Sequence, residues 1–317
     1  MSEKSIKRIA VLGATGHVAK NLIMGMCNEL RFQLTLFARS LDKLASFLLD
    51  NNIQNHVTIE SFDQFCNLDF DVIVNCVGIG DPGKLSEDLS SIFKLTESYD
   101  NLILGYLDKH PKSLYINFSS GAAYLNDFEE HASESMRTKI NINQITTADY
   151  YGICKLNAEA KHRSFADFNI VDLRIFGFFS RYIDLHSNFF LSEIIRCLEA
   201  DKKLITNSLN IVRDYVNPLD LLSLVDLIIN RHNINDVFDV FSSEPTTKFA
   251  ILEYFSTNFG LQYEILDKPS ISSTTGSKFN YFSTNDRATS CMGYLPKYDS
   301  LETIIEEYRS IGIHYRG

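Results

Sequence analysis

The stretch IAVLGATGHVA, residues 9–19, determines the fold of the first half of the chain. Its apolar residues form a strand, and glycines follow at positions 13 and 16, where the chain turns tightly. A helical pattern begins at Gly16 and continues to Leu30. Small residues at the turn let the backbone approach a phosphate, and the N-terminus of the helix favours its negative charge. This order predicts a dinucleotide-binding βαβ unit, and a tight turn without a ligand is the alternative.

Strand and helix patterns alternate after this turn. Strands are predicted at residues 6–12, 33–38, 56–60, 71–76, 113–118 and 170–175, and helices at residues 16–30, 41–49, 86–109 and 148–168. Such alternation builds parallel sheets that helices cover on both faces. We therefore expect a Rossmann-type, doubly wound α/β domain over residues 1–175, which binds the dinucleotide.

The alternation weakens beyond residue 175. Helices are predicted at residues 187–200, 218–230, 248–258 and 301–310, strands at 237–241 and 262–266, and a polar loop at 270–278. We expect residues 176–317 to form a smaller C-terminal α/β lobe that binds the substrate, with part of 208–242 returning to the first domain. The sequence has no internal repeat and no low-complexity linker, so the lobes are expected to pack directly.

The overall composition argues against several classes of function. The 317 residues carry a net charge of −10, and nonspecific nucleic-acid binding needs basic patches instead. Six cysteines without C-x-x-C spacing are typical of reduced thiols. No apolar run approaches the ~18 residues of a membrane span, and the N-terminus lacks a signal-peptide core. We expect a cytoplasmic protein without a nucleic-acid or membrane partner.

The histidines show no metal-ligand spacing. Those considered are His17, His131, His162 and His186, which stand apart from one another in the sequence. We interpret all four as solvated or structural and predict no metal site.

A tyrosine and a lysine four residues apart carry the predicted chemistry. Tyr151 and Lys155 share a face of the predicted helix at 148–168, so the ammonium can lie beside the phenol. A neighbouring cation favours the phenolate and prepares the hydroxyl for proton transfer at neutral pH. Beside a nicotinamide, the pair can exchange a proton with a carbonyl or alcohol oxygen while hydride moves at carbon. The alternative is that Tyr151 and Lys155 are exposed helix residues without a catalytic role.

The end of the second predicted strand bears on the choice of cofactor. NAD-binding domains carry an acidic residue there, which binds the ribose 2′-OH. This chain has Arg39 and Ser40 instead, and their donors suit a 2′-phosphate. We therefore favour NADP(H) over NAD(H), and a surface arginine without a ligand is the alternative. Asp63, after the third strand, is a candidate for the adenine contact.

These residues resemble the extended short-chain dehydrogenase/reductase family, and the resemblance covers nearly the whole chain. Its motifs occur in the family's order: the glycine turn at 13–19, NFSSGAAY at 117–124, the Tyr151 and Lys155 pair, LRIF at 173–176, RDYVNPLD at 213–220 and the segment 286–296. The best-known members act on nucleotide sugars as epimerases, dehydratases and ketoreductases. The resemblance therefore implies a nucleotide-sugar substrate.

The resemblance also implies a role for each motif. Ser120 would hold the substrate oxygen, Tyr151 would act as general acid and base, and Lys155 would favour the Tyr151 phenolate and bind the nicotinamide ribose. Cofactor contacts are implied at Gly13, Thr15, Gly16, His17, Val18, Cys76, Val77 and Gly78, and substrate contacts at Ser120, Gly121, Ala122, Asn188 and Arg213. Arg213 would pair with a substrate phosphate. A surface pair of Arg213 with Asp214 is the alternative.

Departures from the family pattern narrow the reaction. Sugar dehydratases of the family carry an Asp and a Glu after the catalytic Ser or Thr, where this chain has Gly121 and Ala122. Neither can carry a proton, which argues against dehydration. Gly177 replaces an asparagine that often touches the substrate. A nucleotide-sugar 4-ketoreductase is our leading hypothesis, followed by an epimerase with tightly bound NAD and then by a non-catalytic cofactor-binding protein.

An apolar stripe on the predicted helix at 86–109 indicates association. It consists of Leu85, Leu89, Ile92, Tyr99, Ile103 and Tyr106. Family members pair this helix and the catalytic helix across a two-fold axis, so the resemblance implies a homodimer. A stripe that only covers the chain's own sheet is the alternative.

Overall fold

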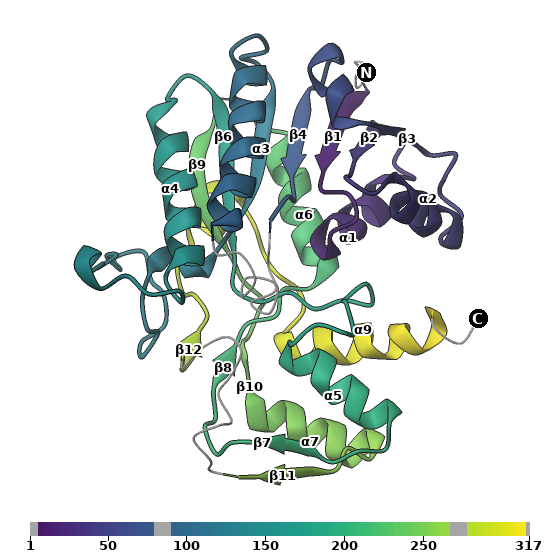
Figure 1. Cartoon of the computed structure of the whole chain (residues 1–317), viewed down its shortest axis with the longest axis vertical. Helices are drawn as coiled ribbons and strands as arrows, with labels where there is room; N and C mark the ends of the chain where they lie inside the picture. The colour runs from purple at the N-terminus through teal and green to yellow at the C-terminus, as the bar shows by residue number, and fades with distance from the viewer. Residues whose placement is uncertain (1–5, 79–89, 232, 267–277, 315–317) are drawn as a thin grey trace.

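The computed structural model describes residues 6–78, 90–231, 233–266 and 278–314. Its largest feature is a parallel sheet in the order β3-β2-β1-β4-β5-β6-β9, which fills the upper part of Figure 1. The strands are β1 Lys7–Leu12, β2 Phe32–Phe37, β3 Val57–Glu60, β4 Val72–Asn75, β5 Leu114–Ser120, β6 Asn169–Ile175 and β9 Asn235–Val240. The order reverses between β1 and β4, so this is a doubly wound Rossmann-type sheet with its switch point there.

Helices cover both faces of the sheet (Figure 1). They are α1 His17–Met26, α2 Leu41–Asp50, α3 Ser91–Leu107, α4 Tyr150–Ser164 and α6 Pro218–Ile229. Ile9 and Val11 of β1 pack with α1, α2 and α6 on one face, whereas Ala10 and Leu12 pack with α3 on the other. This alternation follows from strand geometry, in which successive side chains point to opposite faces.

The second lobe lies below the carboxyl ends of the large sheet in Figure 1. Its helices are α5 Phe190–Glu199, α7 Lys248–Phe259 and α9 Ser300–His314, which share a core that includes Ile194, Leu252 and Ile304. A three-stranded sheet joins β8 Val212–Arg213, β10 Thr246–Thr247 and β12 Asn280–Tyr281, and β7 Leu204–Thr206 pairs with β11 Tyr263–Ile265. In the part of the chain that the structure describes, no helix is long and apolar enough to cross a membrane.

Four short helices complete the described elements. A 3-10 turn η1 spans Phe62–Asn67 after β3, and η3 spans Gly121–Tyr124 directly after β5. A third, η4, spans Ile142–Gln144, and helix α8 spans Arg287–Met292. Of these, η3 matters most, because it follows the predicted catalytic serine.

The first helix is shorter than its apolar pattern suggests. It ends at Met26, and Glu29 N donates a hydrogen bond to Met26 O to close the turn that follows. Leu30 is 95% exposed and lies in the short connection between this turn and β2, which begins at Phe32. The prediction that the helix reaches Leu30 is therefore wrong.

The apolar stripe predicted for association faces the chain's own core. Ile92, Ile103 and Tyr106 of α3 are buried, and Tyr99 packs against the same core. Leu85 and Leu89 lie outside the described residues. The described part of the stripe covers the sheet, and the homodimer stays a prediction.

Candidate active site

The glycine turn after β1 has no space for a side chain at Gly13. Gly13 has a φ of +74°, and a Cβ there would lie 2.9 Å from the backbone of Cys76 and Val77. Gly16 precedes α1 and supplies no side-chain cap, so the first N–H groups of α1 lack that partner. Their positive end faces the switch point between β1 and β4, where a pyrophosphate binds in this fold. The residues present therefore fit a dinucleotide.

His17 contacts the second lobe with its side chain. Its Nε2 lies 2.7 Å from Ser180 Oγ, and its ring meets Phe178 edge-on at 5.0 Å. Burial, with a smaller effect of Lys20, lowers the pKa of His17 to about 3, so the imidazole is neutral. The side chain is structural, and only the backbone of His17 is left for the predicted cofactor contact. Thr15 and Val18, beside it, are half-buried.

The residues predicted to bind the adenosine part lie at neighbouring strand ends. Arg39 is exposed after β2, and Asp63 is exposed in η1, after β3. Ser40 caps α2, because its Oγ accepts a hydrogen bond of 3.4 Å from Lys43 N. Arg39 therefore has an exposed side chain at this end of the sheet, and the Ser40 hydroxyl, which accepts one hydrogen bond, still has its proton to donate.

The predicted catalytic residues come from two adjacent elements. Ser120 is the last residue of β5, and Tyr151 and Lys155 lie in the first turns of α4. Lys155 is 6% exposed, and its Nζ donates a 2.8 Å hydrogen bond to Phe118 O. Its ammonium lies 5.8 Å from the centre of the Tyr151 ring. The predicted proximity of cation and phenol is confirmed.

Lys155 also reaches the predicted cofactor site at the end of β4. A Cβ on Gly78 would lie 3.7 Å from Lys155 Nζ. Cys76, two residues earlier, is half-buried, and burial raises the pKa of its thiol while Lys155 opposes that rise. The segment Cys76–Gly78 therefore lies between the glycine turn and Lys155, the predicted catalytic lysine.

A close approach of two backbones sets Tyr151 beside η3. A Cβ on Gly152 would lie 2.4 Å from Ala122 O and 2.5 Å from Leu125 Cδ2. No side chain fits at that position, so α4 can pack directly on the turn that follows Ser120. Gly152 therefore allows α4, which carries Tyr151, to pack against η3, the turn that follows Ser120.

Tyr281 belongs to this site, and sequence reasoning missed it. Its hydroxyl oxygen lies 3.1 Å from Ser120 Oγ, although the two residues are 161 positions apart. Burial raises the pKa of Tyr281 well above its usual range, and the nearby Tyr151 adds to that rise. Tyr281 lies in β12, a strand of two residues, which is too short for any periodic pattern.

Aromatic rings line the space beyond Ser120. The Tyr281 ring lies 4.7 Å from Phe128 and 5.2 Å from Phe176, measured between ring centres. A Cβ on Gly121 would lie 2.4 Å from the Phe176 ring. An acidic side chain at position 121 would therefore need Phe176 to move, which agrees with the argument against dehydration.

Two cations flank the Tyr281 ring. Arg213 is 8% exposed, and its NH1 donates to Lys278 O at 2.8 Å. Lys278 Nζ lies 4.5 Å from the ring centre of Tyr281. Burial, with a smaller effect of Arg213, lowers the pKa of Lys278 to about 8. Two buried or half-buried cations this close together favour an anionic ligand.

The alternative of a surface pair at Arg213 and Asp214 is wrong. Asp214 is 2% exposed and accepts hydrogen bonds from Ser242 N and Ser300 Oγ. Its backbone also explains Gly177, since a Cβ on Gly177 would lie 2.3 Å from Asp214 O. Asn188, the remaining predicted substrate contact, is exposed just before α5.

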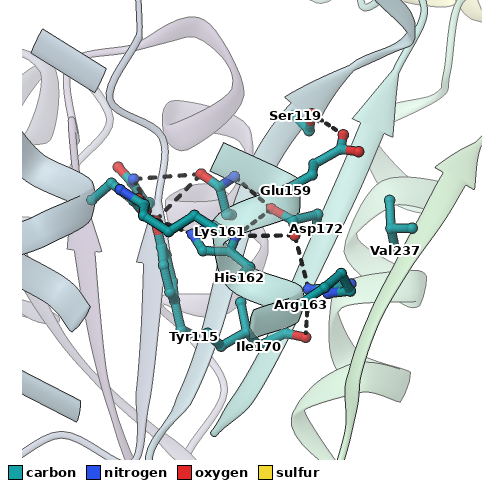
Figure 2. Close-up of polar contacts among 12 residues, drawn as sticks. Tyr115, Ser119, Glu159, Lys161, His162, Arg163, Ile170, Asp172 and Val237 are labelled. Atoms are coloured by element: carbon teal, nitrogen blue, oxygen red, sulfur yellow. Dashed lines mark hydrogen bonds and ion pairs between the residues drawn. The ribbon is translucent and has the colours of Figure 1, made fainter. Parts of the chain in front are cut away.

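A buried polar network connects α4 to the neighbouring elements α3, β5 and β6 (Figure 2). His162 is fully buried, and its Nε2 lies 2.7 Å from Asp100 while its Nδ1 lies 2.9 Å from Asp172. Asp172 also accepts from Asn117 Nδ2 at 2.7 Å and from Arg163 at 2.9 Å. Of the two interpretations of His162, solvated or structural, the structural one is therefore correct.

A second branch of the network lies next to the predicted catalytic residues. Ser119, adjacent to Ser120, donates a hydrogen bond to Glu159, one turn beyond Lys155 on α4 (Figure 2). Arg174 of β6 binds Glu159 through both carboxylate oxygens and lies 3.6 Å from Asp239. Charged groups in the core thus tie β5, β6, β9 and α4 together.

Solved structures share this fold over nearly the full chain. A UDP-glucuronic acid 4-epimerase from Bacillus cereus is 16% identical, with a TM-score of 0.80 over 96% of this chain and 99% of that one. A UDP-glucose-4-epimerase from Stenotrophomonas maltophila is 14% identical, with a TM-score of 0.81 over 98% and 99%. A dTDP-glucose 4,6-dehydratase from Bacillus anthracis is 14% identical, with a TM-score of 0.75 over 96% of each chain.

The sequence itself identifies the family. No curated protein sequence matches significantly. The pattern of the NAD dependent epimerase/dehydratase family matches residues 9–241, which include the glycine turn, Ser120, Tyr151, Lys155 and Arg213. The chain therefore belongs to the NAD dependent epimerase/dehydratase family.

Proposed function

We propose that this protein is an NADP(H)-dependent oxidoreductase that reduces the 4-keto group of a nucleotide-linked sugar. The observation that carries the proposal is the meeting of Ser120 with Tyr281 and of Tyr151 with Lys155, at a turn whose next two residues are Gly121 and Ala122. This arrangement can place hydroxyl groups on a substrate oxygen. It has no carboxylate at 121 or 122 with which to eliminate water.

The protein's own groups act on the oxygen. The nicotinamide dinucleotide, when bound, supplies hydride to the keto carbon. Tyr151 gives its hydroxyl proton to the keto oxygen, and Ser120 donates a hydrogen bond to the same oxygen as negative charge develops there. Lys155, held by Phe118 O, keeps a positive charge beside Tyr151 and stabilises the phenolate that remains.

The cations in the second lobe support a nucleotide-linked substrate. Arg213 and Lys278 present a guanidinium and an ammonium beside Tyr281, and a diphosphate is the anion that such groups bind well. The similar Bacillus cereus enzyme was crystallised with UDP-glucuronic acid, which agrees with a substrate of this class. Binding of the diphosphate there would leave the sugar beside Ser120.

The test is a reduction assay with two named substrates. Purified protein is given NADPH with UDP-4-keto-6-deoxyglucose or dTDP-4-keto-6-deoxyglucose, and the fall in NADPH absorbance is followed. We expect steady oxidation with at least one sugar and none without it. If NADPH is not oxidised with either sugar, the proposed reductase activity is contradicted.

An epimerase is the second candidate, and the comparisons favour it. The Bacillus cereus and Stenotrophomonas maltophila structures are 4-epimerases that contain NAD. An epimerase keeps its cofactor bound through each turnover, whereas a reductase exchanges it. Denaturing the purified protein and identifying any released nucleotide separates the two, since stoichiometric NAD indicates the epimerase.

Arg39 is expected to determine the preference for NADPH. Arg39→Ala should weaken NADPH binding by about 10–100-fold, because hydrogen bonds to a charged group contribute about 1.5–3 kcal/mol each. Binding of NADH, which has no 2′-phosphate, should change little. Dissociation constants from the fluorescence of the reduced cofactors measure both effects.

Lys109→Ala is the matched control for that experiment. Lys109 is an exposed cation just beyond the C-terminal end of α3, away from β2. Its removal should leave both dissociation constants unchanged. Equal losses for NADPH and NADH in Arg39→Ala would contradict the assignment.

A further inference from the structure

Ser120 is held by a residue from the other lobe. Tyr281 lies in β12, which pairs with β8 so that Tyr281 is opposite Arg213. Its ring packs against the rings of Phe128 and Phe176, Lys278 Nζ lies over it, and its hydroxyl lies 3.1 Å from Ser120 Oγ. The residue therefore connects the predicted phosphate-binding side of the pocket to the catalytic serine.

The hydrogen bonds on Ser120 can be counted. A serine hydroxyl has one proton and two acceptor lone pairs. Ala122 N donates to Ser120 Oγ at 3.2 Å and occupies the first lone pair. The Tyr281 hydroxyl is the second neighbour, so its direction decides what Ser120 can still do.

The chemistry of the two hydroxyl groups indicates that Tyr281 donates. Their oxygens lie 3.1 Å apart, and Ser120 Oγ keeps one lone pair for the phenol proton because the Ala122 N–H occupies the other. A phenol is a better donor than an aliphatic hydroxyl, so the phenol proton goes to Ser120. With both lone pairs of Ser120 occupied, its own proton has one place to go, the substrate oxygen.

We propose that Tyr281 is a positioning residue that makes Ser120 an obligate hydrogen-bond donor to the substrate oxygen. The inference rests on the proposed function and deepens it, because a keto oxygen only accepts hydrogen bonds. A serine that can only donate selects such an oxygen and stabilises the charge that grows on it during reduction. Tyr281 thus acts on the substrate through Ser120.

A kinetic double-mutant cycle tests this dependence. The variants are Tyr281→Phe, Ser120→Ala and the double variant, each assayed with NADPH and the keto sugar that the wild type reduces. Tyr281→Phe should lower kcat about tenfold, which corresponds to one net hydrogen bond, and leave the KM for NADPH within about twofold. In the Ser120→Ala background, the same change should have no further effect on kcat.

A structural role alone gives a different result. Tyr281→Phe would then lower kcat by the same factor with and without Ser120, and that additivity would overturn the inference. Tyr263→Phe is the matched control, because Tyr263 lies in the second lobe and packs in the core of α5, α7 and α9. It should leave kcat unchanged.

The contact can also be judged without a substrate. The same cycle, measured by the urea midpoint of the unliganded protein, should show that the shifts of the two single variants do not add. Additive shifts would overturn the inference. If the wild type reduced neither keto sugar while the shifts were non-additive, the proposed function would fail and the Ser120–Tyr281 hydrogen bond would stand.

Discussion

Tyr151→Phe is expected to lower turnover of the keto sugar by about 10²–10⁴-fold, the range that general acid and base catalysis contributes. The phenylalanine keeps the ring in the first turn of α4 and removes only the proton that Tyr151 gives to the substrate. NADPH binding should stay within about twofold, because Lys155 and the glycine turn are unchanged. Rates from NADPH oxidation and dissociation constants from cofactor fluorescence measure the two effects separately.

The neighbouring tyrosine provides a matched control. Tyr150 is the first residue of α4, and its ring packs on Phe93 at 6.0 Å. Tyr150→Phe removes a hydroxyl one residue away and should retain full turnover. Full activity in Tyr151→Phe would sink the proposed mechanism.

Asp172→Asn is expected to lower the free energy of unfolding by about 3–5 kcal/mol, the usual cost of removing one partner from a buried ion pair. The asparagine has the same shape, yet it leaves His162 and Arg163 without the carboxylate that now accepts from both. Urea denaturation followed by circular dichroism measures the change.

The control for this variant is an ion pair near the surface. Arg31 and Asp226 lie 2.6 Å apart, and about a third of each side chain is exposed. Asp226→Asn should cost no more than about 1 kcal/mol. If both variants lose a similar free energy of unfolding, burial does not determine how much the network stabilises the protein.

The same network predicts how stability depends on pH. Burial would lower the pKa of His162, but its hydrogen bonds to Asp100 and Asp172 outweigh burial and raise it to about 9. A raised folded-state pKa means that this stabilisation is complete below the unfolded value, near ~6.5, and is lost as pH rises towards 9. Unfolding curves between these pH values should therefore show decreasing stability. The decrease should be shallower in Asp172→Asn, where one of the two carboxylates is gone.

The sequence predicted the large sheet well because its strands are long and its glycine turn is specific. All seven strands have four to seven residues and alternate with helices along the chain, and the prediction for β9 agrees with the structure to within two residues. The strands β8, β10 and β12 have two residues each, so no periodicity can reveal them. The residues 267–277, which include most of the predicted polar loop, lie outside the described part of the chain.

The candidate site was predictable where its residues lie in motifs. Ser120, Tyr151 and Lys155 fall in short patterns with fixed spacing, and the structure brings the elements that carry them together. Tyr281 meets Ser120 across 161 positions, and His162 meets Asp100 across 62. Contacts of this kind depend on how the lobes and helices pack, which composition and spacing do not encode. His162 looked isolated in the sequence for that reason.

The contact between Gly121 and Phe176 constrains how this enzyme can evolve. The space that an acid at 121 would occupy is filled by the Phe176 ring, 2.4 Å from the position of its Cβ. A single substitution at 121 would collide with that ring before it could contribute new chemistry. A route towards elimination must therefore begin with a smaller side chain at 176, which would itself open the aromatic wall against Tyr281. A change of reaction type at position 121 would thus require a change in the shape of the aromatic pocket.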